Sequence, residues 1–240
     1  MSNEPELIVL SLGWGVQSST LAAMAALGEI PPVDFAVHAD TSWEYQATYS
    51  YAELMTPWLE VHGVRVRTVQ SPRVKVVEKW KSRTEGVMVP AFTLSPQGKE
   101  GQLARQCTST WKIRELRRFA AAELHRRGLT KRPGSVMSLQ GISYDEWHRM
   151  RTSDIAYVVN DYPLVDRKMT RQDCINWLVD NGLQVPQKSS CVFCPYHSKA
   201  EWERLPRRGG EDWETAVSVD LSIRNKRDKF PLFVHPSAGR

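Results

Sequence analysis

The 240-residue sequence has no apolar run that approaches the length of a membrane-spanning helix, about 18 residues. Its first residues, MSNEPEL, lack the basic and apolar regions of a signal peptide. It also has no repeats and no low-complexity tracts. With 41% hydrophobic and 25% charged residues, the chain has the composition of a protein that buries one substantial core. We therefore expect a cytoplasmic protein with no membrane partner.

Cysteine is scarce. The four cysteines are Cys107, Cys174, Cys191 and Cys194. In a chain without secretory signals, so few cysteines argue against a disulfide framework and favour metal or redox chemistry.

The stretch Leu7 to Leu21 lacks the Gly-Lys-Ser/Thr of a Walker A loop and the spaced glycines of a dinucleotide fold. It nevertheless predicts a buried strand, a turn containing Gly13 and Gly15, and a helix that runs to Leu27. Free backbone N–H groups and the positive end of the helix dipole favour an anion above such a strand. An ordinary βα turn with a serine N-cap is the alternative.

The later segments alternate between strand and helix. Strands are expected at 33–39, 64–69, 135–139 and 157–159, and helices at 44–62 and 170–182, the last with Thr170 as N-cap. This order predicts an α/β protein with a parallel sheet and helices on both faces. Ligands gather at the carboxyl ends of such strands, so Asp40 is expected beside the glycine turn, where a carboxylate suits Mg²⁺ or a ribose hydroxyl. A helix N-cap is the other reading of Asp40.

Positive charge is concentrated in one segment. The net charge is +5, and residues 112–132 form a predicted amphipathic helix with many arginines on its polar side. A solvated helix face and a nucleic-acid surface both explain this pattern.

The clearest metal motif is Cys191-Val-Phe-Cys194-Pro195, because a C-x₂-C turn lets two thiolates hold one metal. Cys107 lies at the start of the basic helix, a setting that suits a reactive or ligating thiol, although a buried structural cysteine is also compatible. Cys174, in the first turn of its helix, is the doubtful fourth ligand. Thiolates fit zinc and a [4Fe-4S] cluster equally well.

These motifs together resemble the PP-loop ATP pyrophosphatases, whose phosphate loop reads Ser-Gly-Gly-x-Asp-Ser. Ser11, Gly13, Gly15, Ser18 and Ser19 supply a longer version, with Gln17 where the Asp usually stands. The segment from Asp40 to Glu44 and the segment from Gly141 to Arg151 resemble two elements of the phosphoadenylylsulfate (PAPS) reductase-like branch. The resemblance covers most of residues 7–200.

The resemblance implies an adenine nucleotide alpha hydrolase-like, Rossmann-like fold. It implies a nucleotide-binding domain over residues 1–165 and, packed on it, a cysteine-containing extension over 166–240. ATP and Mg²⁺ would be held by the following residues: Ser11, Gly13, Gly15, Gln17, Ser18, Ser19, Asp40 and Gly141. Asp40, Arg151 and Cys107 would be catalytic, and Cys107, Cys174, Cys191 and Cys194 would ligate the metal.

The implied function is an ATP-dependent sulfurtransferase that adenylates a substrate oxygen, releases pyrophosphate and replaces the oxygen with sulfur held at a [4Fe-4S] cluster. Basic charge favours a tRNA base or DNA as substrate. The sulfur donor would be a cysteine desulfurase or free sulfide, and the sequence leaves a homodimer open.

Two other functions stay open. One is reduction of adenylylsulfate or phosphoadenylylsulfate, against which stands the lack of any cysteine after Cys194. The other is a non-catalytic ATP-binding subunit with structural zinc.

Overall fold

The computed structural model describes residues 4–72, 89–226 and 230–235. The chain divides into two compact units. Unit 1 comprises Met1–Ala39, Ala47–Val69 and Arg114–Ser189, and unit 2 comprises Asp40–Gln46, Gln70–Ile113 and Ser190–Arg240. The predicted boundary after residue 165 remains a prediction from the sequence.

Unit 1 is built on a five-stranded sheet with strand order β3-β2-β1-β6-β7. The strands are β1 (Leu7–Ser11), β2 (Phe35–Asp40), β3 (Val66–Gln70), β6 (Val136–Gln140) and β7 (Val158–Asp161). β1 pairs in parallel with both β2 and β6, and β6 pairs in parallel with β7. The predicted α/β fold with a parallel, Rossmann-like sheet is therefore confirmed.

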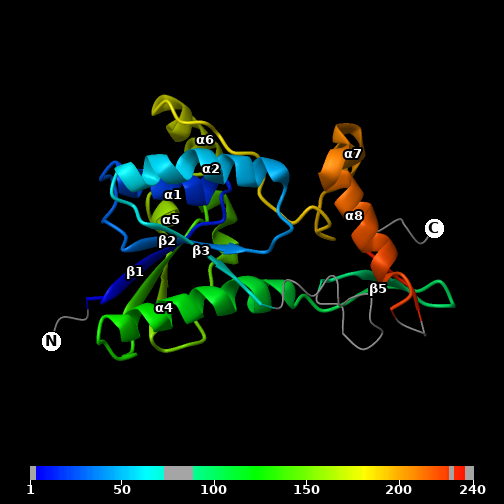
Figure 1. Ribbon diagram of the computed structural model, residues 1–240, viewed down its shortest axis with the longest axis horizontal. Coiled ribbons are helices and arrows are strands. Elements are labelled where there is room, and N and C mark those ends of the chain that lie inside the picture. Colours follow the sequence, from blue (N-terminus) through cyan, green and yellow to red (C-terminus); the bar gives the residue numbers. More distant parts are fainter. Residues whose placement is uncertain (1–3, 73–88, 227–229, 236–240) are drawn as a thin grey trace. The chain divides into compact units, whose positions relative to one another are not determined.

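Helices cover both faces of this sheet (Figure 1). One face carries α1 (Val16–Ala26), α2 (Gln46–Val61), α5 (Pro163–Asp166) and α6 (Arg171–Asp180), and the other carries α4 (Arg114–Arg126). Successive side chains of a strand point to opposite faces, so Leu10 packs in the core with α1 while Val9 packs with Ala120 and Leu124 of α4. The sheet thus has two separate apolar layers.

The predicted N-cap of α6 is confirmed. The Thr170 side chain accepts a hydrogen bond from the Asp173 backbone N–H, and the Asp173 carboxylate accepts one from the Thr170 backbone N–H. This reciprocal capping box satisfies two backbone donors at the start of the helix.

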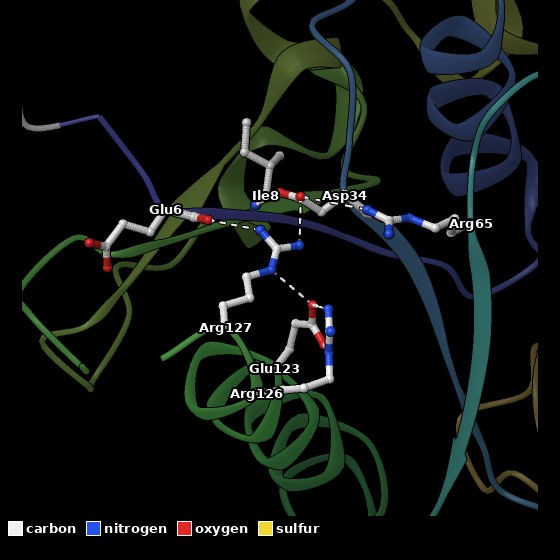
Figure 2. Close-up of polar contacts among 7 residues, drawn as sticks. All are labelled: Glu6, Ile8, Asp34, Arg65, Glu123, Arg126 and Arg127. Atoms are coloured by element: carbon white, nitrogen blue, oxygen red, sulfur yellow. Dashed lines mark hydrogen bonds and ion pairs between the residues drawn. The ribbon is translucent and has the colours of Figure 1, made fainter. Parts of the chain in front are cut away.

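A network of charged groups ties α4 to the amino ends of β1 and β2 (Figure 2). Arg127 donates to the Glu6 backbone carbonyl, to the Asp34 carboxylate at 2.7 Å and to the Glu123 carboxylate at 2.8 Å. Arg126 makes two further hydrogen bonds to Glu123, both of 2.7 Å. Asp34 also accepts from the backbone N–H of Ile8, at 2.8 Å. These contacts of Arg126 and Arg127 outweigh burial and lower the pKa of Glu123 to about 2.

Unit 2 has its own sheet and core. The antiparallel strands are β4 (Phe92–Leu94), β5 (Glu100–Gln102) and β8 (Leu232–Phe233), in the order β5-β4-β8. A π-helical turn, η2 (Thr108–Ile113), and the helices α7 (Lys199–Arg208) and α8 (Gly210–Ile223) complete it. Its core includes Trp111, Phe193, Leu205, Val219 and Leu232.

Within the three described ranges, every helix is too short or too polar to cross a membrane.

Candidate functional site

The loop between β1 and α1 is closed by one serine hydroxyl. The backbone N–H of Gly13 donates to Ser18 Oγ at 3.1 Å, and the Ser18 hydroxyl donates to the Gly15 carbonyl at 3.2 Å. Gly15 is the N-cap residue of α1, and it contributes no side-chain cap. The first turn of α1 therefore begins at the carboxyl end of β1, as the sequence predicted.

Trp14 fixes this loop in place. Its backbone adopts a positive φ of 56°, a conformation that costs a residue with a side chain about 1–2 kcal/mol. Its indole is 2% exposed and lies edge-on to the Tyr51 ring, with ring centroids 6.2 Å apart. Burial of the indole holds the strained backbone, so the loop is organised by packing as well as by hydrogen bonds.

The two other serines predicted to bind ATP lie in different elements, Ser11 at the end of β1 and Ser19 within α1. Ser11 lies on the α4 side of β1, where it lines a cavity of about 30 Å³ with Ser138 and Arg117. Ser19 is buried in α1 next to Tyr51. Burial raises the pKa of Tyr51 to about 12, and the nearby Ser19 hydroxyl acts in the opposite direction. Their predicted contacts with ATP stay predictions.

The loop that follows β6 touches the start of α1. A Cβ atom added to Gly141 would lie 2.7 Å from the Ser18 backbone nitrogen and 2.9 Å from Ser18 Cα. Only glycine fits at such a distance from backbone atoms. The two loops that the sequence singled out are therefore packed against each other in unit 1.

Gln17 connects the same two loops through its side chain. Its amide nitrogen donates to Glu146 Oε2 at 3.2 Å and to Ser143 Oγ at 3.3 Å. Glu146 lies in η3 (Tyr144–Arg149), a 3₁₀ helix, and forms an ion pair of 2.6 Å with Arg149. An aspartate at position 17 would face the Glu146 carboxylate, whereas a neutral amide can donate to it. This contact gives a physical reason for the glutamine.

Arg151, predicted to be catalytic, turns toward its own loop. Its guanidinium donates to the backbone carbonyls of His148 and Met150, at 2.9 and 2.7 Å.

Asp40 ends β2 and organises the turn that follows it. Its carboxylate accepts from the Ser42 backbone N–H at 2.7 Å and from Gln70 Nε2 at 3.2 Å. Ser42 has a positive φ of 60°, which this contact helps to hold. The role of Asp40 as a magnesium ligand stays a prediction.

In unit 2, the segment around Glu44 pairs with the segment that carries the Cys-x₂-Cys motif. The Val192 N–H donates to the Trp43 carbonyl at 2.7 Å, and Glu44 and Cys191 form an antiparallel bridge. The Cys194 N–H donates to the Cys191 carbonyl at 3.0 Å, which closes the turn between the two cysteines. The Thr41 hydroxyl lies 3.3 Å from Cys191 Sγ.

An ion pair lies among these cysteines. Lys112 Nζ is 2.8 Å from Glu44 Oε1, and the Glu44 side chain is only 1% exposed against 39% for Lys112. Burial alone would lower the pKa of Lys112. The nearby Glu44 carboxylate and the Cys191 and Cys107 side chains raise this pKa by more, so the net shift is upward. Glu44 was not among the site residues predicted from the sequence. The signal in the sequence is a threonine, Thr41, that is followed three residues later by this glutamate, just before a helix begins.

The three cysteines of unit 2 are electrostatic neighbours. Burial is the largest cause that raises the pKa of Cys191, to about 12; Glu44 adds to it and Lys112 opposes it. Burial also raises the pKa of Cys194, with a further contribution from Cys107. Within the described part of the chain, no three or more histidine, cysteine or acidic side chains are already arranged to hold a metal. The thiols themselves are ligands that suit zinc and iron–sulfur clusters.

Cys174 lies in the apolar core of unit 1. Its side chain is fully buried with residues such as Leu21 and Leu178, and its backbone carbonyl accepts a hydrogen bond from Thr20. Burial raises the pKa of this thiol to about 11. A thiol in this environment packs like a small apolar side chain.

Comparison with protein-family models and with curated proteins found no match. Among solved structures, a phosphoadenylyl-sulfate reductase from Candida auris, in complex with phosphate, has a TM-score of 0.50 and 13% identity; the match covers 81% of this chain and 83% of that one. The U34-tRNA thiolase NcsA from Methanococcus maripaludis, solved with its [4Fe-4S] cluster, has a TM-score of 0.44 and 12% identity over 91% of this chain and 72% of that one. At this identity the first likeness establishes the fold alone, and the second is too weak to add to it.

Proposed function

We propose that this chain, which has the fold of phosphoadenylyl-sulfate reductase and of the PP-loop proteins that it resembles in sequence, is an ATP-dependent sulfurtransferase. The loops after β1 and β6 in unit 1 would bind the phosphates of ATP, and the cysteines of unit 2 would hold the group that carries sulfur. The observation that carries the proposal is the close contact between the loop after β1 and the loop after β6, at Ser18 and Gly141.

The proposed reaction begins with attack of a substrate oxygen on the α-phosphorus of ATP, which breaks the bond to pyrophosphate. The oxygen then carries AMP and becomes a good leaving group. The backbone N–H groups at the start of α1 would stabilise the charge that develops on the phosphate oxygens. Asp40 is the proposed ligand of Mg²⁺, and Arg151 the proposed cation nearest the reacting phosphate.

Three thiols, Cys107, Cys191 and Cys194, are the proposed ligands of a [4Fe-4S] cluster. These three thiolates would leave one iron of such a cluster without a protein ligand, and the cluster would then supply a place to hold sulfide. The ammonium of Lys112, held by Glu44, would lie near these thiolates and favour their charged form, while the Glu44 carboxylate acts in the opposite direction. Cys174 remains the fourth predicted ligand, but its enclosure in the unit 1 core favours a structural role.

A nucleic acid is the proposed substrate class, either a tRNA base or DNA, because the net charge is +5. Sulfur would come from a cysteine desulfurase or from free sulfide.

The first test is the content of iron, zinc and acid-labile sulfide after anaerobic purification of the wild type, Cys191→Ala and Cys174→Ala. We expect about four irons in the wild type, loss of the cluster in Cys191→Ala, and an intact cluster in Cys174→Ala. The two variants are matched, because each removes one thiol by the same substitution.

Other results would contradict the proposal. Zinc without labile sulfide, together with ATP binding and no pyrophosphate release, would identify a nucleotide-binding subunit with structural zinc. Release of sulfite from adenylylsulfate or phosphoadenylylsulfate would identify a reductase. Loss of the cluster in Cys174→Ala would make Cys174 a ligand.

A further inference from the structure

An exposed aromatic and cationic surface lies on and beside η3. We define the η3 surface as Tyr144, Trp147, Arg149 and Arg151. Trp147 is 62% exposed and Tyr144 is 45% exposed, and the Arg149 side chain is 57% exposed. Large aromatic side chains at such exposure leave apolar area in contact with water, which often marks a binding surface.

The η3 surface adjoins the loop that we propose to bind ATP. Glu146, the residue before Trp147, accepts a hydrogen bond from Gln17 in the first turn of α1, at 3.2 Å. The start of η3 is held firmly, because the Tyr144 N–H donates to the Met169 carbonyl at 2.7 Å and the Arg171 N–H donates to Asp145 at 3.0 Å. The exposed rings are therefore carried by a fixed segment at the proposed nucleotide site.

Of the two arginines of this surface, Arg149 is paired with Glu146, and the charge of Arg151 is available to a ligand. Arg151 makes its hydrogen bonds to backbone carbonyls, and among the described residues the structure gives it no carboxylate partner. Asp145 accepts from the Arg171 N–H, and Glu146 is shared by Gln17 and Arg149. The two acidic groups of the segment are thus engaged within unit 1.

The sequence indicated the basic helix α4 as a nucleic-acid surface. Much of the positive charge on and just after this helix is neutralised by ion pairs within the protein. Arg117 pairs with Asp154, Arg118 with Glu115 at 3.4 Å, and Arg127 with Asp34 at 2.7 Å. Glu123 forms ion pairs with both Arg126 and Arg127 (Figure 2). Each carboxylate lowers the local potential that would attract a phosphate.

We propose that the η3 surface binds an unpaired, single-stranded part of the nucleic-acid substrate. Trp147 stacks on a base, Tyr144 widens the apolar platform, and the positive charge of Arg151 favours the approach of a polyanion. Single-stranded nucleic acids are bound in this manner elsewhere, by aromatic rings that stack on bases beside cations that follow the backbone. This inference rests on the proposed function, because it names the surface by which the substrate reaches the activated ATP.

The test is fluorescence anisotropy of labelled single-stranded RNA and DNA oligonucleotides at one fixed, moderate salt concentration. We expect Trp147→Ala to weaken binding about tenfold, and Trp147→Phe to restore most of it, since loss of one stacking contact has an effect of this size. Leu54→Ala is the matched control, because Leu54 is 54% exposed on α2, away from η3 in the sequence. Arg118→Ala tests α4.

Binding of ATP and release of pyrophosphate are measured on the same variants. If the wild type releases pyrophosphate but binds no oligonucleotide, the inference is wrong and the proposed ATP chemistry stands. If Trp147→Ala weakens ATP binding and leaves oligonucleotide binding unchanged, the ring contacts adenine instead. If Arg118→Ala weakens oligonucleotide binding and Trp147→Ala does not, α4 is the surface. A wild type that neither binds ATP nor releases pyrophosphate contradicts the proposed function itself.

Discussion

At the scale of single residues, the clearest prediction concerns a side chain added at Gly141. A side chain there would press on the backbone of Ser18, which cannot rotate away as a side chain can. We expect Gly141→Ala to lower the free energy of unfolding by about 1–3 kcal/mol, as overpacking does in other cores, and to weaken ATP binding. Urea unfolding and calorimetric titration of ATP measure the two effects.

The matched variant is Gly15→Ala. A Cβ at Gly15 would meet only the Ser189 hydroxyl, at 2.9 Å, and that side chain can turn aside. The loss of unfolding free energy should therefore be smaller in Gly15→Ala than in Gly141→Ala. An equal loss in both variants would show that general loop strain, and not the contact with Ser18, sets the cost.

Residue types were easier to predict than the partners of their side chains. Gly141 and Gln17 were recognised from the sequence, but the contact between Gly141 and Ser18 joins positions more than a hundred residues apart. The catalytic role of Arg151 stays a prediction; the hydrogen bonds of its guanidinium to backbone carbonyls of its own loop are a finding that the sequence did not indicate. Spacing along the chain identifies a loop, but it does not determine the rotamer of a long side chain.

At the scale of elements, the ion pairs between α4 and the sheet predict a pH dependence. The pKa of Glu123 is lowered to about 2 in the folded state from an ordinary value near 4.5. A group with a lowered folded pKa stabilises the fold above its unfolded pKa, and this contribution is lost as the pH falls toward about 2. We expect Glu123→Gln to be less stable at pH 7 by about 1.5–3 kcal/mol, the range for hydrogen bonds to charged groups.

The check is urea unfolding of both proteins from pH 7 down to pH 2.5. The difference in unfolding free energy between wild type and Glu123→Gln should shrink through the acid range. A constant difference would mean that the substitution acts through packing and not through the charge of Glu123.

The elements themselves were largely predictable, because apolar periodicity reflects burial on one or both faces. The predicted helix 44–62 is observed at Gln46–Val61, and the predicted strand 135–139 at Val136–Gln140. The exception is the segment around Glu44, which pairs with Val192 and Cys191 before α2 begins. A short pairing between distant segments leaves no periodic pattern, so the position of Glu44 among the cysteines was not foreseen, whereas Lys112 was expected near a cysteine from its place in the sequence.

At the scale of the whole molecule, the loops proposed to bind ATP belong to unit 1 and the thiols proposed to hold the cluster belong to unit 2, and hydrogen exchange can follow each group. A non-hydrolysable ATP analogue should slow exchange in residues 11–18 and 140–146 of unit 1. Reconstitution with iron and sulfide should slow exchange in residues 190–197 of unit 2. Ligands that bind only the folded state stabilise it, by about 2.7 kcal/mol at a hundred times the dissociation constant.

Each ligand serves as the control for the other. Protection of residues 190–197 by the ATP analogue alone would contradict the assignment of ATP to unit 1. Protection of residues 11–18 by iron and sulfide alone would contradict the assignment of the cluster to unit 2.

The division into two units also bears on how the protein is made. The chain passes from one unit to the other five times, at residues 39–40, 46–47, 69–70, 113–114 and 189–190. On the ribosome, unit 1 has all its residues once position 189 has emerged, whereas unit 2 needs the segment from Ser190 onward. Cys107 is therefore translated well before Cys191 and Cys194, and under the proposal that the three thiols hold one cluster, its thiol must stay reduced until these two are made. Each unit is made of separate segments of the chain, so neither is encoded by one continuous stretch of the gene.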